Sequence, residues 1–150
     1  MQEAVNAAVE GMSNNEGGPF GCVIVKDGVI VGRGNNKVTS TNDPTAHAEV
    51  TAIRDACKNL NSFQLEGCEI FTSCEPCPMC LGAIYWARPD KVYYGSNQID
   101  AANIGFDDAF IYREIPLPYE NRSIPFEQLG RDIAIQAFEK WERKDDKTKY

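Results

Sequence analysis

The sequence predicts an α/β fold in which helices cover both faces of a mixed β-sheet. Stretches rich in β-branched residues alternate along the chain with stretches of helical periodicity, which is typical of such sheets. Asp27-Gly28 joins two of the apolar runs and is a strong β-hairpin signal, so the sheet contains an antiparallel pair. The 150 residues suffice for one domain with a sizeable core. We therefore expect a single domain over residues 1–150.

The first half of the chain is expected to begin with an amphipathic helix, followed by a hairpin and a second helix. The apolar face of the opening helix is predicted from residues at helical spacing, namely Val5, Ala8, Val9 and Met12. Hairpin strands are predicted over residues 20–26 and 29–32, and residues 33–45 are polar and rich in turn formers. The second helix is expected to start near Ala46 with Asp43 or Thr45 as its cap.

The second half is expected to alternate short strands and helices. Strands are predicted over residues 69–73 and 91–94. Pro78 suits the first turn of a helix running to about Ala87, which Arg88-Pro89 would stop. Further along, the sequence suggests a short helix within residues 100–108, an extended segment over 110–115 and a last helix around Ile133, Ala134, Ala137 and Trp141.

The net charge of the chain limits the classes of partner that it is expected to bind. The net charge is −7, and fifteen basic residues are scattered among twenty-two acidic ones. Nucleic-acid binding relies on basic side chains that neutralise phosphates, so no nucleic-acid partner is expected and a small neutral substrate fits better. No apolar run reaches the roughly 20 residues of a membrane helix, and the N-terminus lacks a signal-peptide pattern. We expect a cytoplasmic protein without a membrane partner.

The chemistry-bearing residues fall in two short segments. His47-Ala48-Glu49 stands at the start of the second predicted helix, and Pro76-Cys77-Pro78-Met79-Cys80 at the start of the third. Residues three apart share a helix face, so Cys77 and Cys80 can offer two thiolates to one metal, with His47 as a third ligand. Three protein ligands leave one position of a tetrahedral zinc site open, as in catalytic rather than structural sites. We therefore predict one Zn²⁺ per chain.

Glu49 is the candidate proton shuttle of this site. Two residues apart on a helix normally point away from each other, but in a first turn that faces a cavity both His47 and Glu49 can reach it. Helix N-termini also favour thiolates and other anions. We expect Glu49 to transfer protons during hydrolysis.

Plainer interpretations of the same residues stay open. A lone histidine is more often a core or surface residue than a ligand, and C-x-x-C also occurs in redox pairs. The Pro76, Pro78 and H-x-E context does not fit a redox motif. Cys74 would be the fourth ligand of a structural zinc site, although it stands ahead of the helix.

The combined H-x-E…P-C-x-x-C pattern is the signature of zinc-dependent deaminases. The chain resembles the cytidine-deaminase superfamily from Gly18-Pro19-Phe20-Gly21 to about residue 115. This resemblance implies a three-layer α/β/α fold around a mixed five-stranded sheet, and hydrolytic removal of an amino group.

Within that superfamily the chain looks like the bacterial guanine deaminases, on Gly105-Phe106-Asp107-Asp108 and the C-terminal Tyr150 above all. The resemblance implies hydrolysis of guanine to xanthine and ammonia. It places Asp108 at the donor edge of the base as a second catalytic carboxylate, and Asn36 at the acceptor edge. The other substrate contacts that it implies are Phe20, Ala48, Trp86 and Tyr150. It further implies a homodimer, with a C-terminal segment that can be exchanged between the subunits.

Other functions remain open at this point. The alternatives are a deaminase of guanosine, cytosine or tRNA adenosine, and a non-enzymatic, zinc-stabilised binding module. The charge of −7 argues against tRNA, and the intact Glu49 argues against a module without activity. Without the resemblance, Asp108 would be a solvated turn residue, Trp86 a core residue and Tyr150 the end of a disordered tail.

Overall fold

The computed structural model of the protein describes residues 1–149. The chain divides into two compact units, Met1–Ile111 and the residues from Tyr112 onward. Across residues 1–149, no helix has both the length and the apolar character that a membrane crossing requires. The two units are described separately below.

The first unit is built on a mixed sheet in the order β2-β1-β3-β4. The strands are β1 (Gly21–Lys26), β2 (Val29–Asn35), β3 (Cys68–Cys74) and β4 (Lys91–Ser96). β1 pairs antiparallel with β2 and β3, whereas β3 and β4 are parallel, which confirms the mixed sheet. Within residues 1–149 the sheet has four strands, so the expectation of a five-stranded sheet was wrong. The Asp27-Gly28 hairpin is confirmed, with φ of 50° and 79° at its two turn residues.

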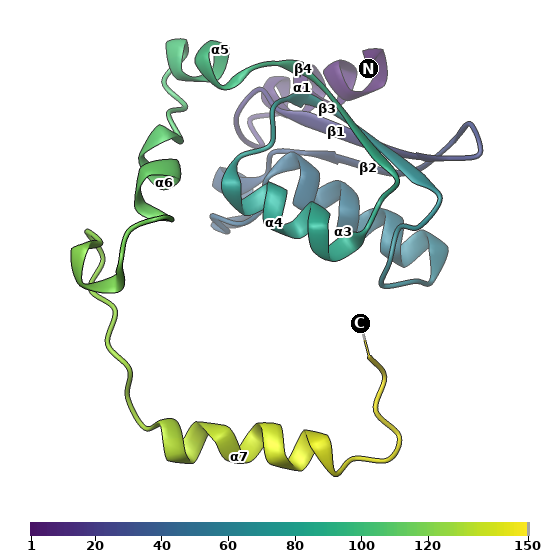
Figure 1. Ribbon diagram of the computed structural model, residues 1–150. Helices are drawn as coiled ribbons and strands as arrows, with labels where there is room; N and C mark the ends of the chain where they lie inside the picture. The colour runs from purple at the N-terminus through teal and green to yellow at the C-terminus, as the bar shows by residue number, and fades with distance from the viewer. Residues whose placement is uncertain (150) are drawn as a thin grey trace. The chain divides into compact units, whose positions relative to one another are not determined.

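Helices cover both faces of this sheet and form the expected three layers. α1 (Gln2–Ser13) lies on one face, and α3 (Ala48–Leu60) and α4 (Pro78–Ala87) lie on the other (Figure 1). The short helices α2 (Val38–Thr41) and α5 (Gln98–Asn103) follow β2 and β4. The core between the sheet and α3 and α4 consists mainly of small and β-branched side chains, among them Cys22, Ile24, Ala52, Ile70 and Ile84.

The helices lie close to the sheet at its glycines, and this decides which side chains they bury. α1 buries Ala4, Ala7, Ala8 and Gly11, whereas Val5, Val9 and Met12 are exposed. The predicted apolar face is therefore confirmed for Ala8 and wrong for Val5, Val9 and Met12. Small residues face the sheet because the backbone of α1 lies directly against β1. A Cβ on Gly21 would lie 2.1 Å from the carbonyl oxygen of Ala4.

Two predicted segment boundaries also need correction. Residues 33–35 continue β2 rather than starting a turn region. α3 begins at Ala48 with His47 as its N-cap, and neither Asp43 nor Thr45 caps it, because Asp43 instead accepts bonds from the backbone and hydroxyl of Thr45.

The segment predicted as extended over residues 110–115 is helical. α6 spans Ala109–Glu114. Its aromatic and β-branched residues favour a strand by propensity, but the Asp107 carboxylate accepts a bond from the Ala109 N–H and starts a helix instead.

The second unit contains a 3₁₀ turn, η1 (Tyr119–Asn121), and the helix α7 (Arg131–Glu142). α7 confirms the predicted last helix. Tyr119 stacks on Phe126 with ring centroids 5.4 Å apart, and the Arg122 guanidinium lies over the Tyr119 ring. No described side chain of α7 is buried within the chain.

We expect Gly34→Ala to destabilise the first unit strongly. A Cβ at Gly34 would lie 2.4 Å from the Ala48 carbonyl oxygen and 2.4 Å from the Ala52 nitrogen, which are backbone atoms of α3 that cannot move aside cheaply. Overpacking of this kind costs about 1–3 kcal/mol or more in the free energy of unfolding. Urea denaturation measures it, with Val29→Ala on the exposed end of the same strand as the control. Equal stabilities of the two variants would contradict the close packing.

Candidate metal centre

Two helix starts carry the predicted metal ligands. His47 is the N-cap of α3 and Cys77 is the N-cap of α4, and both have extended backbones, with ψ of 158° and 167°. Pro78 occupies the first turn of α4, as its sequence position predicted. Cys80 lies in the same turn and is fully buried. The local sequence therefore places three ligand side chains where two positive helix ends converge.

The donor atoms of these residues fit a zinc ion. The Nδ1 atom of His47 lies 3.5 Å from Cys77 Sγ and 3.5 Å from Cys80 Sγ. Tetrahedral zinc bound to sulfur and nitrogen at its usual bond lengths would hold such atoms about 3.6 Å apart. All three donor atoms lie within 4.8 Å of one another. Cys74 does not belong to this group, and its thiol contacts the Asn97 carbonyl oxygen at 3.7 Å.

Glu49 lies beside this group in the first turn of α3. Its side chain is buried, with an exposed fraction of 6%. Oε1 accepts a hydrogen bond from the Thr72 hydroxyl at 2.9 Å, and Oε2 accepts one from the Cys80 thiol at 3.3 Å. Thr72 belongs to β3, so a hydrogen bond from the sheet holds the carboxylate. The first turn of α3 places the same carboxylate beside the metal group.

The group is strongly coupled electrostatically when it holds no metal. The hydrogen-bonding interaction between the two thiols lowers the pKa of Cys77 to about 4 and raises the pKa of Cys80. The hydrogen bond to Cys77 raises the pKa of His47. Burial raises the pKa of Glu49. The site therefore concentrates negative charge and protons at a place where a divalent cation would replace the protons.

A cavity of about 500 Å³ opens beside the metal group. Of the residues predicted from the sequence, it is lined by Phe20, Asn36, His47, Glu49, Cys77 and Asp108. Ala48 is fully buried and Trp86 is 66% exposed on α4, and neither lines the cavity. Tyr150 lies outside the described residues. The structure thus brings both predicted catalytic carboxylates to one cavity.

Asn36 has a defined orientation at this cavity. The residue is buried, and its Oδ1 atom accepts bonds from the backbone N–H groups of Gly18 at 3.3 Å and Val38 at 3.2 Å. These two donors settle which end of the amide is the oxygen. The amide NH₂ group is therefore the end that Asn36 can offer to a ligand.

The lining residues that sequence reasoning missed include Glu75, Gln98 and Phe106. Phe106 packs edge-to-face on Phe20 with ring centroids 4.9 Å apart, and a Cβ on Gly18 would lie 2.9 Å from the Phe106 ring. Gly18 and Phe106 both stand in segments that the sequence singled out. Only the tertiary contact shows that the glycine makes room for the ring.

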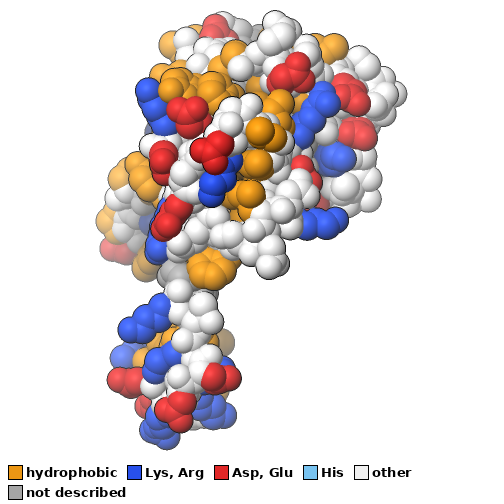
Figure 2. All heavy atoms as spheres, turned by 90° about the vertical axis from the view of Figure 1, so that its right-hand side faces the viewer, with side chains coloured by type: hydrophobic (Ala, Val, Ile, Leu, Met, Phe, Trp, Pro, Cys, Tyr) orange, Lys and Arg blue, Asp and Glu red, His pale blue; other side chains and the backbone are white. Residues whose placement is uncertain are grey.

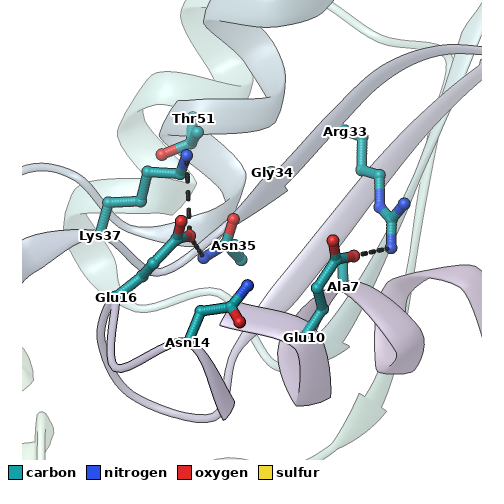
Figure 3. A pocket seen from close by; sticks show the side chains of 9 residues that line it. All are labelled: Ala7, Glu10, Asn14, Glu16, Arg33, Gly34, Asn35, Lys37 and Thr51. Carbon is teal, nitrogen blue, oxygen red and sulfur yellow. Dashed lines mark hydrogen bonds and ion pairs between the residues drawn. The ribbon is translucent and has the colours of Figure 1, made fainter. Parts of the chain in front are cut away.

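A second, smaller hollow of about 220 Å³ lies between α1 and β2 (Figure 3). Its charged side chains are paired with one another: Arg33 with Glu10 at 2.8 Å, and Lys37 with Glu16 at 3.7 Å. It contains no histidine or cysteine among its lining residues. The hollow therefore offers surface ion pairs rather than a reactive centre.

Such a metal group beside a buried glutamate, at the edge of an α/β/α sandwich, defines the zinc-dependent deaminases as a class. The model of the cytidine and deoxycytidylate deaminase zinc-binding region matches residues 1–96, and the chain belongs to this family.

Among known members, the chain is similar over its whole length to the guanine deaminase of Bacillus subtilis. The two are 56% identical over 150 residues, which cover 100% of this chain and 96% of that protein. The X-ray structure of the B. subtilis guanine deaminase superposes with a TM-score of 0.97 and covers 99% of this chain and 95% of that one.

More distant relatives match less of the chain or match it less closely. A structure of a guanine deaminase from Nitrosomonas europaea is 27% identical with a TM-score of 0.68, covering 93% of this chain and 81% of that one. The tRNA-specific adenosine deaminase of Aquifex aeolicus is 46% identical over 78 residues, which are 52% of each chain.

Proposed function

We propose that this protein hydrolyses guanine to xanthine and ammonia. The observation that carries the proposal is the cavity in which the metal group, Glu49, Asn36 and Asp108 meet. Full-length similarity to the B. subtilis guanine deaminase supports guanine as the base. The four groups together provide activation of water, proton transfer and recognition of both edges of a purine.

In the proposed reaction, His47, Cys77 and Cys80 would hold the zinc ion. Zinc bound in such a site lowers the pKa of water and makes it nucleophilic at neutral pH. Glu49 accepts one proton from the attacking water and delivers it to the ring as the C2–O bond forms. It then transfers the second proton of the water from the new hydroxyl group to the amine, which leaves as ammonia when the C2–N bond breaks. The bond that its Oε1 atom accepts from the Thr72 hydroxyl keeps the carboxylate in place through both transfers. Products are xanthine and ammonia, so atoms and charge balance without a further reactant.

Recognition of guanine rests on groups of opposite character. Asp108 offers a carboxylate to the N–H donors of the base, and the Asn36 amide offers donors to its oxygen and nitrogen acceptors. Phe20, supported by Phe106, provides an apolar wall against which a purine can stack. Closure of the pocket by Tyr150 stays a prediction from the family resemblance, as do contacts from Ala48 and Trp86.

The surface charge favours a small substrate over tRNA. No lysine or arginine is among the described residues that line the cavity. On the face that Figure 2 presents, basic side chains are interspersed with acidic ones. A polyanion would gain little from such a surface at a net charge of −7.

A substrate panel tests the proposal. Zinc-loaded protein should release ammonia from guanine fastest among guanine, guanosine, adenine, adenosine, cytosine and cytidine, because only guanine presents both matching edges without a ribose. Xanthine formation, followed by chromatography, checks the product. Turnover of adenosine in a tRNA anticodon stem in place of guanine would contradict the proposal.

A homodimer with an exchanged C-terminal segment is a further part of the proposal. The residues beyond Tyr112 leave large apolar side chains exposed, including Leu129 at 90% and Ile133 at 75%. Tyr85 on α4 is 75% exposed as well. Exposed apolar side chains of this size support the proposed dimer interface. We also place the enzyme in the cytoplasm and in purine metabolism, which suits its six free cysteines.

Sedimentation should give about twice the 16.7 kDa mass of the chain. Leu129→Asp should weaken this dimer, since it would place a charge in the apolar contact. Gln136→Asp, on the exposed surface of α7, is the matched control and should leave the mass unchanged. A monomer at every concentration of the unmodified protein would contradict the dimer.

A further inference from the structure

Gln98 makes two hydrogen bonds to other residues that line the cavity. Its side-chain amide donates to Asp108 Oδ1 at 2.9 Å, and its backbone N–H donates to Glu75 Oε2 at 3.1 Å. Glu75 stands two residues before Cys77 and lines the same cavity as Gln98 and Asp108. One residue therefore joins the segment that leads into the metal group to the second carboxylate of the cavity.

The residues around Gln98 fix it firmly. Asn97 caps α5 in a reciprocal capping box with Asp100, so that the first turn of the helix is closed. The Glu75 N–H donates to the Ser96 carbonyl oxygen at 2.9 Å, and the Ser96 hydroxyl donates to the Ser73 carbonyl oxygen at 3.0 Å. The backbone just before Gln98 is thus hydrogen-bonded to residues 73 and 75, at the end of β3.

The two neighbouring aspartates of the cavity have different partners. Asp107 Oδ1 accepts from the Ala109 N–H and starts α6. Asp108 Oδ1 accepts from the Gln98 side-chain amide, and Asp108 lines the cavity. Asp107 therefore has a structural role at the start of α6, and Asp108 is the aspartate that is bound by another lining residue of the cavity.

We infer that Gln98 is a positioning residue for guanine deamination, which holds the Asp108 carboxylate at a fixed place relative to the metal group. The inference rests on the proposed function, in which Asp108 binds the donor edge of the base and takes part in proton transfer. A carboxylate held by one amide bond on Oδ1 keeps its orientation while Oδ2 engages substrate. Displacing a catalytic group by about 1 Å can cost roughly 100-fold in rate.

A double-mutant cycle on turnover of guanine tests this inference. The variants are Gln98→Met, which keeps the length of the side chain without a donor, Asp108→Ala, and both together. Gln98→Met should lower kcat roughly 10- to 100-fold, with zinc content and melting temperature unchanged. In the Asp108→Ala background the same change should have no further effect, because the group that it positions is gone. Gln2→Met on the exposed face of α1 is the matched control.

The outcomes separate the inference from the function on which it rests. No ammonia from guanine with the unmodified protein would overturn the proposed substrate, and full activity of Asp108→Ala would overturn the role of Asp108. If both hold, multiplying losses in the double variant would overturn the positioning role of Gln98. A rise in KM alone would also overturn it, because Gln98 would then contact the substrate directly. Wild-type kinetics of Gln98→Met would reject any role for this residue.

Discussion

Glu49→Gln is expected to retain zinc and lose nearly all turnover. The amide has the size of the carboxyl group and can still accept from Thr72, but it cannot take up a proton from water and deliver it to the leaving amine. Positioned proton transfer contributes about 10²–10⁴-fold to rate. Because the same group acts at two stages of the reaction, we expect the loss in kcat at the upper end of that range.

Two measurements on the same preparation decide this prediction. Metal analysis should find as much zinc in the variant as in the unmodified protein, and the kcat for guanine should fall by about three to four powers of ten. Glu69→Gln is the control, since Glu69 lies on β3 outside the cavity and accepts a bond from the Tyr93 hydroxyl. Retained turnover in Glu49→Gln would mean that another group moves the protons.

Cys77→Ser is expected to lose both zinc and activity. A serine hydroxyl does not ionise near neutral pH and is a poor zinc ligand, so the site would keep two of its three protein ligands. Zinc would then dissociate during purification, and turnover should fall below detection. The variant also loses the stabilisation that a bound metal confers, because an ion that binds only the folded state raises its stability by mass action.

Thermal melts with and without added zinc check this result independently of activity. Zinc should raise the melting temperature of the metal-free unmodified protein but not that of Cys77→Ser. Cys57→Ser is the matched control, because Cys57 is a free, partly exposed cysteine of α3 outside the metal group. A Cys77→Ser protein that binds one zinc per chain with full affinity would show that Cys77 is not a ligand.

Local signals in the sequence predicted most of the fold. Asp27-Gly28 supplies the positive φ angles that a tight hairpin needs, and Pro78 suits a first helical turn, so both elements formed as expected. The wrong predictions arose where a neighbour overrides the local pattern. In α1, Val5 and Val9 are the more apolar residues, but only alanine and glycine allow the helix to approach β1. Residues 110–115 have strand propensity, but the Asp107 carboxylate starts a helix.

The part of the candidate site that could be predicted is the part whose residues stand in short sequence motifs. His47, Glu49, Cys77 and Cys80 stand in two such motifs at helix starts, and the structure brings their side chains together. Gln98 stands in no motif, and its importance follows only from a bond to a residue ten positions away. Phe106 likewise reaches the cavity through its contact with Phe20, which no periodicity predicts.

The proton on the Cys80 thiol, whose pKa is raised, links metal loading to the acidity of the surroundings. Two sulfurs cannot both bind zinc until that proton has gone to the solvent. The apparent zinc affinity should therefore increase as the pH rises. In calorimetry, the heat of loading should depend on the ionisation enthalpy of the buffer that receives the proton. Zinc loading of this protein is therefore coupled to the release of a proton.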